Sequence, residues 1–221
     1  MNILHKATHV FVGGKSGMGK TTFALRYILG SPHTRVFIFD HQGEFATRLG
    51  IAEEDTAGNL ERFFELAETN RVVPFDFVPT GYDKETAFAV FCSAAFDTAR
   101  AIEEGGHKGS CLFVCDELQQ FVSAQNCPPE FKQIVETGRR WNFDTLSLSQ
   151  RPNAVNAAIR EQFTEMILFR LQDENSLKFA GSIGADVGEV MRLPPHHYLY
   201  YNVISGGERK GELRFVRKGT T

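Results

Sequence analysis

The segment Gly14-Lys15-Ser16-Gly17-Met18-Gly19-Lys20-Thr21 decides the fold, because it matches the pattern GxxxxGK followed by Ser or Thr. An apolar run at residues 8–12 precedes it and predicts a strand, and a segment with helical periodicity follows it as far as Gly30. Glycines let the backbone N–H groups of such a loop turn toward a phosphate, and the first turn of the helix adds partial positive charge. The stretch therefore predicts a binding site for the phosphates of a nucleotide.

Two side chains at the end of this loop have distinct expected roles. Lys20 is expected to contact the β- and γ-phosphates of ATP and to act in catalysis, and the hydroxyl of Thr21 is expected to hold Mg²⁺. ATP is then the substrate and Mg²⁺ the cofactor. The expected nucleotide-binding residues are Gly14, Lys15, Ser16, Gly17, Met18, Gly19, Lys20, Thr21 and Thr22.

A pair of carboxylates follows the most apolar strand that the sequence predicts, at residues 111–115. Parallel sheets bind ligands at the carboxyl ends of their strands, which is where this run places Asp116 and Glu117. Asp116 is the expected second protein ligand of Mg²⁺, and Glu117 is the expected general base that polarises the attacking water. An acidic pair after a buried strand is common by itself, so this prediction depends on the phosphate-binding loop.

A third polar group, Ser149-Gln150-Arg151-Pro152, follows the strand expected at residues 145–149. In P-loop ATPases of the additional-strand type, such a strand lies between the strand before the phosphate-binding loop and the strand before the acidic pair. Gln150 would then face the γ-phosphate and sense or orient the attacking water. The alternative is that these residues form an ordinary polar loop.

The order of apolar and helix-period segments predicts an α/β fold with a mostly parallel central sheet flanked by helices. Further strands are expected at 35–40, 72–77 and 165–170, and Pro74 places the second of them at an edge. Helices are expected at about 57–68, 84–103 and 173–191, after Pro128-Pro129, and after Asn153 as an N-cap. A hairpin is expected from 198–204 and 212–216. The fold class is therefore a P-loop NTPase of additional-strand type with a C-terminal hairpin, in a single domain covering residues 1–221.

The composition is that of a globular chain. Of the 221 residues, 42% are hydrophobic and 23% are charged, which excludes a largely disordered protein. No transmembrane segment or signal peptide is expected, because no apolar run is long enough. Four cysteines without a CxxC pair favour reduced thiols in the cytoplasm, and His196-His197 are interpreted as structural residues. The net charge of −3 excludes a globally basic surface, although residues 205–221 form a basic segment.

Five blocks occur in an order that resembles the FtsK–HerA family of DNA-pumping ATPases. They are Asp40-His41-Gln42-Gly43-Glu44, Asp116-Glu117, Gly138-Arg139-Arg140, Ser149-Gln150-Arg151-Pro152, and Ile159-Arg160 leading to Ile167-Leu168-Phe169-Arg170. The likeness covers residues 10–204 approximately, and the Gln-Arg-Pro block is its discriminating part. Within the family the chain is similar to the small packaging ATPases of membrane-containing icosahedral viruses. Like them, it shows neither the membrane anchor of chromosome and conjugation pumps nor the N-terminal barrel of archaeal repair translocases.

The resemblance implies an ATPase that hydrolyses ATP to translocate double-stranded DNA, in this case a viral genome-packaging motor. It also implies a homo-oligomeric ring, with viral portal or capsid vertex proteins as partners, in the host cytoplasm and at the packaging vertex of the virion. Family members use an arginine from a neighbouring subunit to stabilise charge on the γ-phosphate. Arg139 and Arg140 are the first candidates for that residue and Arg160 is the second. The alternative for each is a solvated surface charge.

Two segments are candidates for DNA contact, because each can place basic side chains against phosphates. One is the loop before the acidic-pair strand, at residues 105–109, and the other is the basic segment 205–221. The candidate residues are Lys108, Arg209, Lys210 and Arg214. The alternative for both segments is a flexible polar loop.

Two other functions remain open from the sequence. One is an assembly ATPase of filamentous-phage type, similar to the zonula occludens toxin-like proteins, which usually carry a transmembrane segment after the ATPase domain. The other is a nucleotide-dependent switch that binds ATP without pumping DNA. The presence of Lys20, Asp116 and Glu117 argues against an inactive site. Stimulation of ATP turnover by DNA would separate a motor from a switch.

Overall fold

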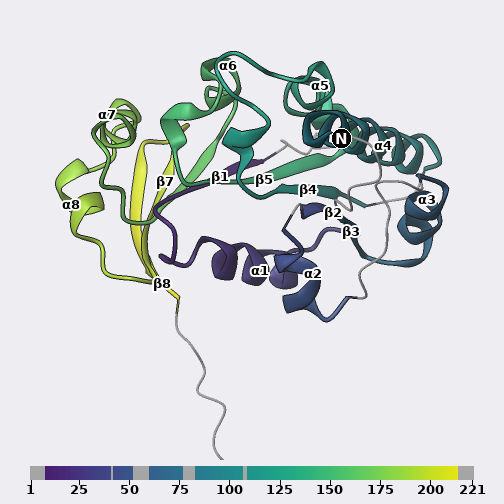
Figure 1. Cartoon of the computed structure of the whole chain (residues 1–221), viewed down its shortest axis with the longest axis horizontal. Coiled ribbons are helices and arrows are strands. Elements are labelled where there is room, and N and C mark those ends of the chain that lie inside the picture. Colours follow the sequence, from purple (N-terminus) through teal and green to yellow (C-terminus); the bar gives the residue numbers. More distant parts are fainter. Residues whose placement is uncertain (1–7, 41, 52–59, 77–82, 107–108, 214–221) are drawn as a thin grey trace, which may run out of the picture.

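The computed structural model describes residues 8–40, 42–51, 60–76, 83–106 and 109–213, and its eight strands form one sheet (Figure 1). The strands are β1 (His9–Gly13), β2 (Arg35–Asp40), β3 (Val72–Asp76), β4 (Cys111–Cys115), β5 (Phe143–Ser149), β6 (Glu165–Leu168), β7 (His197–Asn202) and β8 (Gly207–Glu212). Their order across the sheet is β3-β2-β4-β5-β1-β6-β7-β8.

Most of the sheet is parallel, which confirms the predicted fold class. β1 to β6 run parallel to one another, whereas β7 is antiparallel to β6 and β8 is antiparallel to β7. β5 pairs with β4 on one side and with β1 on the other. The expected additional strand therefore lies between β1, which precedes the phosphate-binding loop, and β4, which precedes the acidic pair. β3, which contains Pro74, is an edge strand as predicted.

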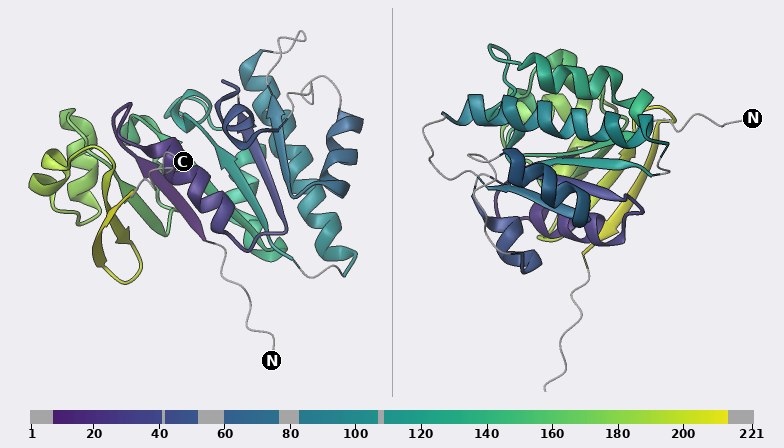
Figure 2. Two further views of the ribbon diagram at one scale, coloured as in Figure 1. Left: turned by 90° about the horizontal axis from the view of Figure 1, so that it is seen from below. Right: turned by 90° about the vertical axis from the view of Figure 1, so that its right-hand side faces the viewer.

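Helices cover both faces of the sheet (Figures 1 and 2). α1 and α2 lie on one face, α3 to α6 lie on the other, and α7 and α8 lie beside the β7–β8 end. The helices are α1 (Lys20–Gly30), α2 (Glu44–Leu49), α3 (Leu60–Thr69), α4 (Lys84–Glu104), α5 (Pro129–Thr137), α6 (Ala157–Arg160), α7 (Glu174–Ser182) and α8 (Val187–Arg192). Three 3₁₀ turns are η1 (Leu118–Gln120), η2 (Gly138–Trp141) and η3 (Pro152–Ala154).

Successive residues of each central strand alternate between two hydrophobic cores. In β2, Phe37 and Phe39 face the core that includes α3 and α4, whereas Val36 and Ile38 face the core that includes α1 and α2. The first core is rich in aromatic rings, and the ring centroids of Phe39 and Phe88 lie 5.1 Å apart. Burial on both faces explains why these strands appear in the sequence as continuous apolar runs.

Two predicted elements have different boundaries in the structure. The C-terminal hairpin is present, but its second strand begins directly after the turn, at Gly207, and residues 214–221 lie outside the described part. The segment 173–191 forms two helices, α7 and α8, instead of one. Gly184 lies between them with a φ of 91°, a left-handed conformation that glycine adopts readily and that interrupts the helix.

Two further helical features differ from the prediction. The helix after the Gln-Arg-Pro block is the single turn α6, and its cap is Asn156, which accepts a hydrogen bond from the N–H of Ala158, and not Asn153. α2 is an additional helix, whose six residues are too few to produce a clear periodicity. Within the described ranges, no helix combines the length and hydrophobicity needed to cross a bilayer.

Candidate active site

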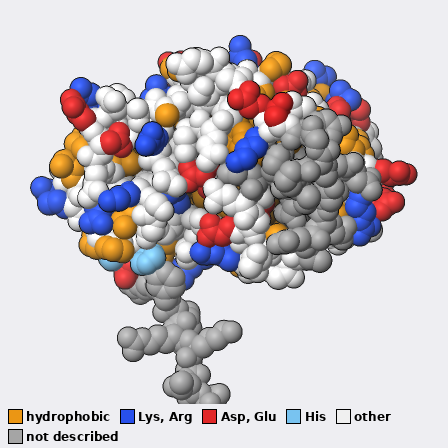
Figure 3. All heavy atoms as spheres, in the orientation of Figure 1, with side chains coloured by type: hydrophobic (Ala, Val, Ile, Leu, Met, Phe, Trp, Pro, Cys, Tyr) orange, Lys and Arg blue, Asp and Glu red, His pale blue; other side chains and the backbone are white. Residues whose placement is uncertain are grey.

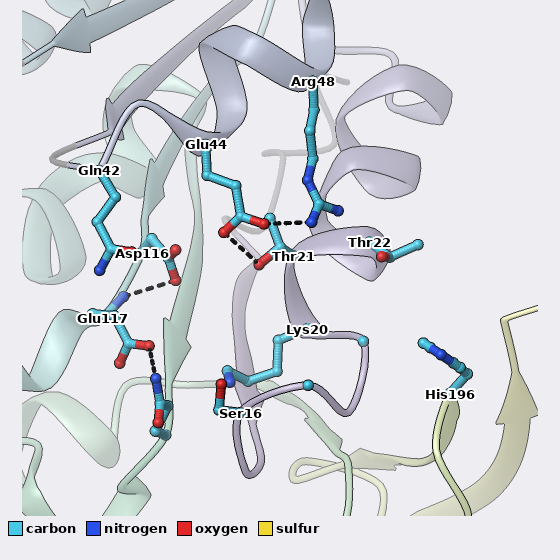
Figure 4. A pocket seen from close by; sticks show the side chains of 13 residues that line it. Ser16, Lys20, Thr21, Thr22, Gln42, Glu44, Arg48, Asp116, Glu117 and His196 are labelled. Atoms are coloured by element: carbon cyan, nitrogen blue, oxygen red, sulfur yellow. Dashed lines mark hydrogen bonds and ion pairs between the residues drawn. The ribbon is translucent and has the colours of Figure 1, made fainter.

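A cavity of about 270 Å³ lies at the carboxyl ends of β1, β4 and β5, which are neighbours in the sheet (Figure 4). Its walls come from the loop before α1, from α2, from the residues that follow β4 and β5, and from the segment before β7. Lys20, Thr21, Asp116, Glu117 and Gln150 all line it. The structure therefore brings together three groups that the sequence marks at separate places along the chain.

The phosphate-binding loop contributes backbone as well as side chains to the cavity. Ser16, Gly17, Gly19 and Thr22 line it in addition to Lys20 and Thr21. Gly17 has a φ of 76°, and a Cβ at this position would meet nothing within 4 Å, so the backbone lies open to the cavity. α1 begins at Lys20 with no side-chain cap and no acidic residue in its first turn. Its first N–H groups are therefore available to an anion.

The other three predicted residues of the loop lie outside the cavity wall. Gly14 is buried, and a Cβ there would lie 2.6 Å from Cβ of Phe169, so only glycine allows this close contact. Lys15 is exposed, and its Nζ donates a hydrogen bond of 2.9 Å to Oε1 of Gln172. The carbonyl of Met18 accepts a hydrogen bond from another segment of the chain. These three residues shape the loop instead of lining the cavity.

Lys20 lies inside the cavity among carboxylates. Only 7% of its surface is exposed, and its Nζ makes a long hydrogen bond of 3.5 Å to the carbonyl of Lys15. Burial lowers the pKa of Lys20, and the charges of Glu117, Asp116 and Glu44 act in the opposite direction. A buried ammonium group with one weak backbone contact is suited to bind a phosphate.

Asp116 and Glu117 are buried side by side, each with 6% of its surface exposed. Oδ1 of Asp116 accepts a hydrogen bond of 2.9 Å from the backbone N–H of Glu117. Burial, followed by the charge of Glu117, raises the pKa of Asp116 to about 6. The ionised form of Asp116 is thus costly in this structure, and a cation at the site would favour it.

Two amide groups hold the carboxylate of Glu117. Gln150 donates a hydrogen bond to Oε1 and Gln119 donates one to Oε2. Glu117 also has a φ of 51° and a ψ of 45°, a left-handed conformation that costs a residue with a side chain some energy. Gln150 takes the place that the sequence predicts, whereas Gln119 is a contact that sequence reasoning missed. The only feature of the sequence that could have indicated this contact is the position of Gln119, a polar residue two positions after the acidic pair.

Glu44, at the start of α2, is a further carboxylate that sequence reasoning did not assign to the site. Its Oε2 accepts a hydrogen bond of 3.4 Å from the hydroxyl of Thr21, and its Oε1 pairs with Nη2 of Arg48 at 2.6 Å (Figure 4). Asp40 fixes the start of α2, because its Oδ2 accepts a hydrogen bond of 2.8 Å from the N–H of Ala46. The block 40–44 contributed to the family resemblance, and the structure places its last residue in the cavity.

His196 lines the opposite side of the cavity, so its interpretation as a structural residue is incomplete. Its backbone N–H donates a hydrogen bond of 3.0 Å to the carbonyl of Met18, which ties the segment before β7 to the phosphate-binding loop. A Cβ on Gly19 would lie 2.9 Å from Nδ1 of His196. The close approach of the two segments therefore requires glycine at position 19.

The oxygen donors of the cavity suit Mg²⁺ that is bound together with a nucleotide, and they are too few for a metal ion that only protein side chains hold. The described residues contain no group of three or more His, Cys, Asp or Glu side chains that could hold a metal ion. Mg²⁺ in nucleotide sites takes one or two protein oxygens and completes its shell with phosphates and water. Thr21 and Asp116 are two such oxygen donors in one cavity. Burial, followed by the charge of Glu117, raises the pKa of Asp116, so a cation bound there would favour its ionised form.

The arginines predicted to act in catalysis lie away from this cavity. Arg139 and Arg140 are exposed in η2, which follows α5 and precedes β5. Gln150 follows the other end of β5, and seven strand residues span roughly 20 Å. The Cζ of Arg160 lies 5.1 Å from the ring centroid of Phe179. A role for any of them at a nucleotide would need a second chain and stays a prediction.

The residues predicted to contact DNA are described only in part. Lys108 and Arg214 lie outside the described residues. Arg209 and Lys210 are exposed on the edge strand β8, and Nζ of Lys210 pairs with Glu189 of α8. Basic and acidic side chains are interspersed over the face shown in Figure 3. Arg209 is therefore the described residue to which the DNA-contact prediction applies most directly.

No family model and no curated protein sequence matches this chain. Solved structures do match it. The genome-packaging NTPase B204 of Sulfolobus turreted icosahedral virus 2, in complex with ATP-γS, has a TM-score of 0.73 at 15% identity, and the match covers 96% of this chain and 100% of that chain. The complex of B204 with AMPPCP has a TM-score of 0.71 at 16% identity and covers 94% and 98%.

Bacterial proteins share the same fold. VirB4 of Thermoanaerobacter pseudethanolicus has a TM-score of 0.64 at 11% identity, with 95% of this chain and 90% of that chain covered. EccC (ATPases 2 and 3) of Thermomonospora curvata has a TM-score of 0.60 at 12% identity, with 96% of this chain and 37% of that chain covered. The chain therefore shares the fold of these NTPases and ATPases, which is the fold that the resemblance implied. At these identities the likeness concerns the fold.

Proposed function

We propose that this chain is a Mg²⁺-dependent ATPase that translocates double-stranded DNA during viral genome packaging. The observation that carries the ATPase activity is the convergence of Lys20, Asp116, Glu117 and Gln150 in one cavity. These residues supply a phosphate ligand, a metal ligand, a base and a group that orients water. The similarity to the packaging NTPase B204 supports the packaging role.

The loop and α1 bind the phosphates in this proposal. The first N–H groups of α1 carry no cap, and the helix dipole places partial positive charge at the same point. Nζ of Lys20 adds a full positive charge, and its burial in the cavity strengthens its interaction with a phosphate. Gly17 keeps the backbone next to the phosphates free of side-chain atoms.

Thr21 and Asp116 hold Mg²⁺ in this proposal. When bound, Mg²⁺ would neutralise charge on the β- and γ-phosphates. Ionised Asp116 is disfavoured by its burial and by Glu117 beside it, and a bound divalent cation would favour its ionised form. The buried carboxylate is therefore a reason for the site to require a divalent cation.

Glu117 is the base that takes a proton from the attacking water. Two features fix the direction of the Glu117 side chain. Gln150 and Gln119 donate hydrogen bonds to its carboxylate, and its backbone has a left-handed conformation. Gln150 is exposed as well as bonded to Glu117, so its amide can contact the base and a water molecule next to it. These contacts orient the reacting groups, which is how general bases become effective.

The finer parts of the proposal concern partners. The motor is a homo-oligomeric ring around double-stranded DNA, contacts a viral portal or capsid vertex, and acts in the host cytoplasm and at the packaging vertex of the virion. Arg139, Arg140 or Arg160 would supply positive charge to the cavity of a neighbouring subunit. Exposed Arg209 would contact DNA phosphates, with Lys108, Lys210 and Arg214 as further candidates.

The direct test is ATP hydrolysis by the full chain with Mg²⁺, measured with and without double-stranded DNA. We expect Mg²⁺-dependent hydrolysis that increases when DNA is added. Lys20→Ala is the control, because it removes the phosphate ligand and should lose turnover while the chain stays folded. Absence of hydrolysis in the wild-type protein under all conditions would contradict the proposal. Hydrolysis that DNA does not change would favour the nucleotide-dependent switch.

A further inference from the structure

Glu44 contacts the threonine that ends the phosphate-binding loop. Oε2 of Glu44 accepts a hydrogen bond of 3.4 Å from Oγ1 of Thr21, and both side chains line the same cavity (Figure 4). The two residues are far apart in the sequence and come from different helices, α1 and α2. The contact thus joins the first turn of α1 to the first residue of α2.

The position of Glu44 is fixed from two sides. Arg48, one helical turn later, pairs with the other carboxylate oxygen at 2.6 Å, so Oε2 is the oxygen left for Thr21. The start of α2 is itself tied to β2 by the hydrogen bond from the N–H of Ala46 to Asp40. The Glu44 side chain is 33% exposed, so it contacts solvent as well as lining the cavity.

The chemistry of a hydroxyl explains what this contact does. A threonine hydroxyl has one proton to donate and two lone pairs to offer. When the hydroxyl donates its hydrogen bond to a carboxylate, both lone pairs remain available to a cation. Outer partners of this kind orient metal ligands in many sites, and their loss typically lowers metal affinity about 10–100-fold.

We propose that Glu44 is a positioning residue for the metal ligand Thr21. By accepting the hydrogen bond from the Thr21 hydroxyl, it leaves the lone pairs of the hydroxyl oxygen free for Mg²⁺, and its negative charge adds to the attraction for the cation. The same charge repels the phosphates of a nucleotide that arrives without metal. Glu44 therefore makes nucleotide binding depend on Mg²⁺, an inference that rests on the proposed ATPase function.

The test is the affinity for a fluorescent, non-hydrolysable ATP analogue, measured on the full chain with saturating Mg²⁺ and again with a chelator. The informative quantity is the ratio of the two Kd values, because it does not depend on the fraction of folded protein in the sample. Glu44→Gln keeps the size of the side chain and removes its charge. We expect this variant to lose about tenfold or more of the Mg²⁺ effect, with metal-free affinity unchanged or higher.

The matched control is Glu65→Gln. Glu65 pairs with Arg62 on the surface of α3 at 3.0 Å, outside the cavity, so this change should leave the ratio at the wild-type value. Glu44→Ala serves as a second variant if Glu44→Gln destabilises α2, because alanine has a high helix propensity. A ratio of the two Kd values that stays at the wild-type value, including the case in which both affinities fall equally, would overturn the role of Glu44. A wild-type chain that binds no nucleotide under either condition would instead overturn the ATPase function itself.

Discussion

The side-chain amide of Gln150 donates a hydrogen bond to the carboxylate of Glu117. Gln150 is the first residue after β5 and Glu117 is the second residue after β4. The two strands are adjacent, with Cys115 opposite Ser147. The contact therefore joins the ends of neighbouring strands at the cavity. In the proposed mechanism it links the base directly to the residue that orients the water.

The change Glu117→Gln tests the base. The amide keeps the shape of the side chain and removes the lone pair that takes the proton from water. We expect binding of ATP to persist and hydrolysis to fall about 10²–10⁴-fold, the usual contribution of a general base. Single-turnover hydrolysis and nucleotide binding measured on the same sample separate the two effects. Turnover within a few-fold of wild type would show that another group is the base.

The change Gln150→Leu tests the contact between the two strand ends. Without the amide, Glu117 loses one of its two hydrogen-bond donors and the water loses its orienting group. We expect kcat to fall about 10–100-fold with KM nearly unchanged, because misplacing a reacting group affects the chemical step. Gln120→Leu is the control, since Gln120 is exposed in η1 and does not line the cavity. A raised KM with a normal kcat would assign Gln150 to nucleotide binding.

Asp116→Asn should make the nucleotide-free protein more stable at alkaline pH. The pKa of Asp116 is raised from 3.8 to about 6 on folding, so the folded state binds its proton more tightly than the unfolded state. The contribution of Asp116 to stability is therefore fully present below pH 4 and is lost as the pH rises through 6. We expect the variant to gain about 3 kcal/mol in the free energy of unfolding at pH 8.

Urea unfolding at several pH values measures this gain. The advantage of Asp116→Asn should shrink as the pH falls from 6 toward 4, where Asp116 becomes protonated in both states. Asp97→Asn is the control, because the Asp97 side chain is 56% exposed and pairs with Arg100 on the surface of α4. A destabilised Asp116→Asn protein at pH 8 would mean that the ionised carboxylate stabilises the fold, which contradicts a pKa raised by burial.

Mixing two inactive variants tests whether neighbouring subunits share the active site. Lys20→Ala lacks the phosphate ligand, and the double variant Arg139→Ala/Arg140→Ala lacks the first candidates for an arginine in trans. In a mixed ring, some cavities have an intact Lys20 and a neighbour with both arginines, so ATPase activity should partly return. An arginine in trans is worth about 10³–10⁵ in rate. If the mixture stays inactive although both variants assemble, the positive charge comes from another residue.

The sequence predicted the centre of this structure because its signals are local. The phosphate-binding loop, the acidic pair and Gln150 each follow a strand, and the carboxyl ends of parallel strands meet at one edge of the sheet. Predicting that β5 separates β1 from β4 therefore sufficed to bring Gln150 next to Glu117. The contact between them follows from strand order, which the additional-strand arrangement of P-loop ATPases predicts.

The rest of the site depends on contacts between segments whose sequences contain no motif or periodicity that would predict those contacts. Glu44 reaches Thr21 from a six-residue helix that is too short to show periodicity, and His196 reaches the loop through a backbone hydrogen bond. Neither contact can be inferred from residue spacing, because each depends on how a connecting segment returns to the sheet. The position of Arg139, at the opposite end of β5 from the cavity, is likewise evident only in three dimensions.

Displacement of a third strand from a DNA duplex measures ATP-driven translocation without relying on hydrolysis rates. The full chain is mixed with a long linear duplex that carries a labelled triplex-forming strand, with Mg²⁺ and ATP. We expect the wild-type protein to release the third strand and Glu117→Gln to release none, although that variant still binds ATP. Steady ATP hydrolysis by the wild-type protein without release of the third strand would contradict translocation.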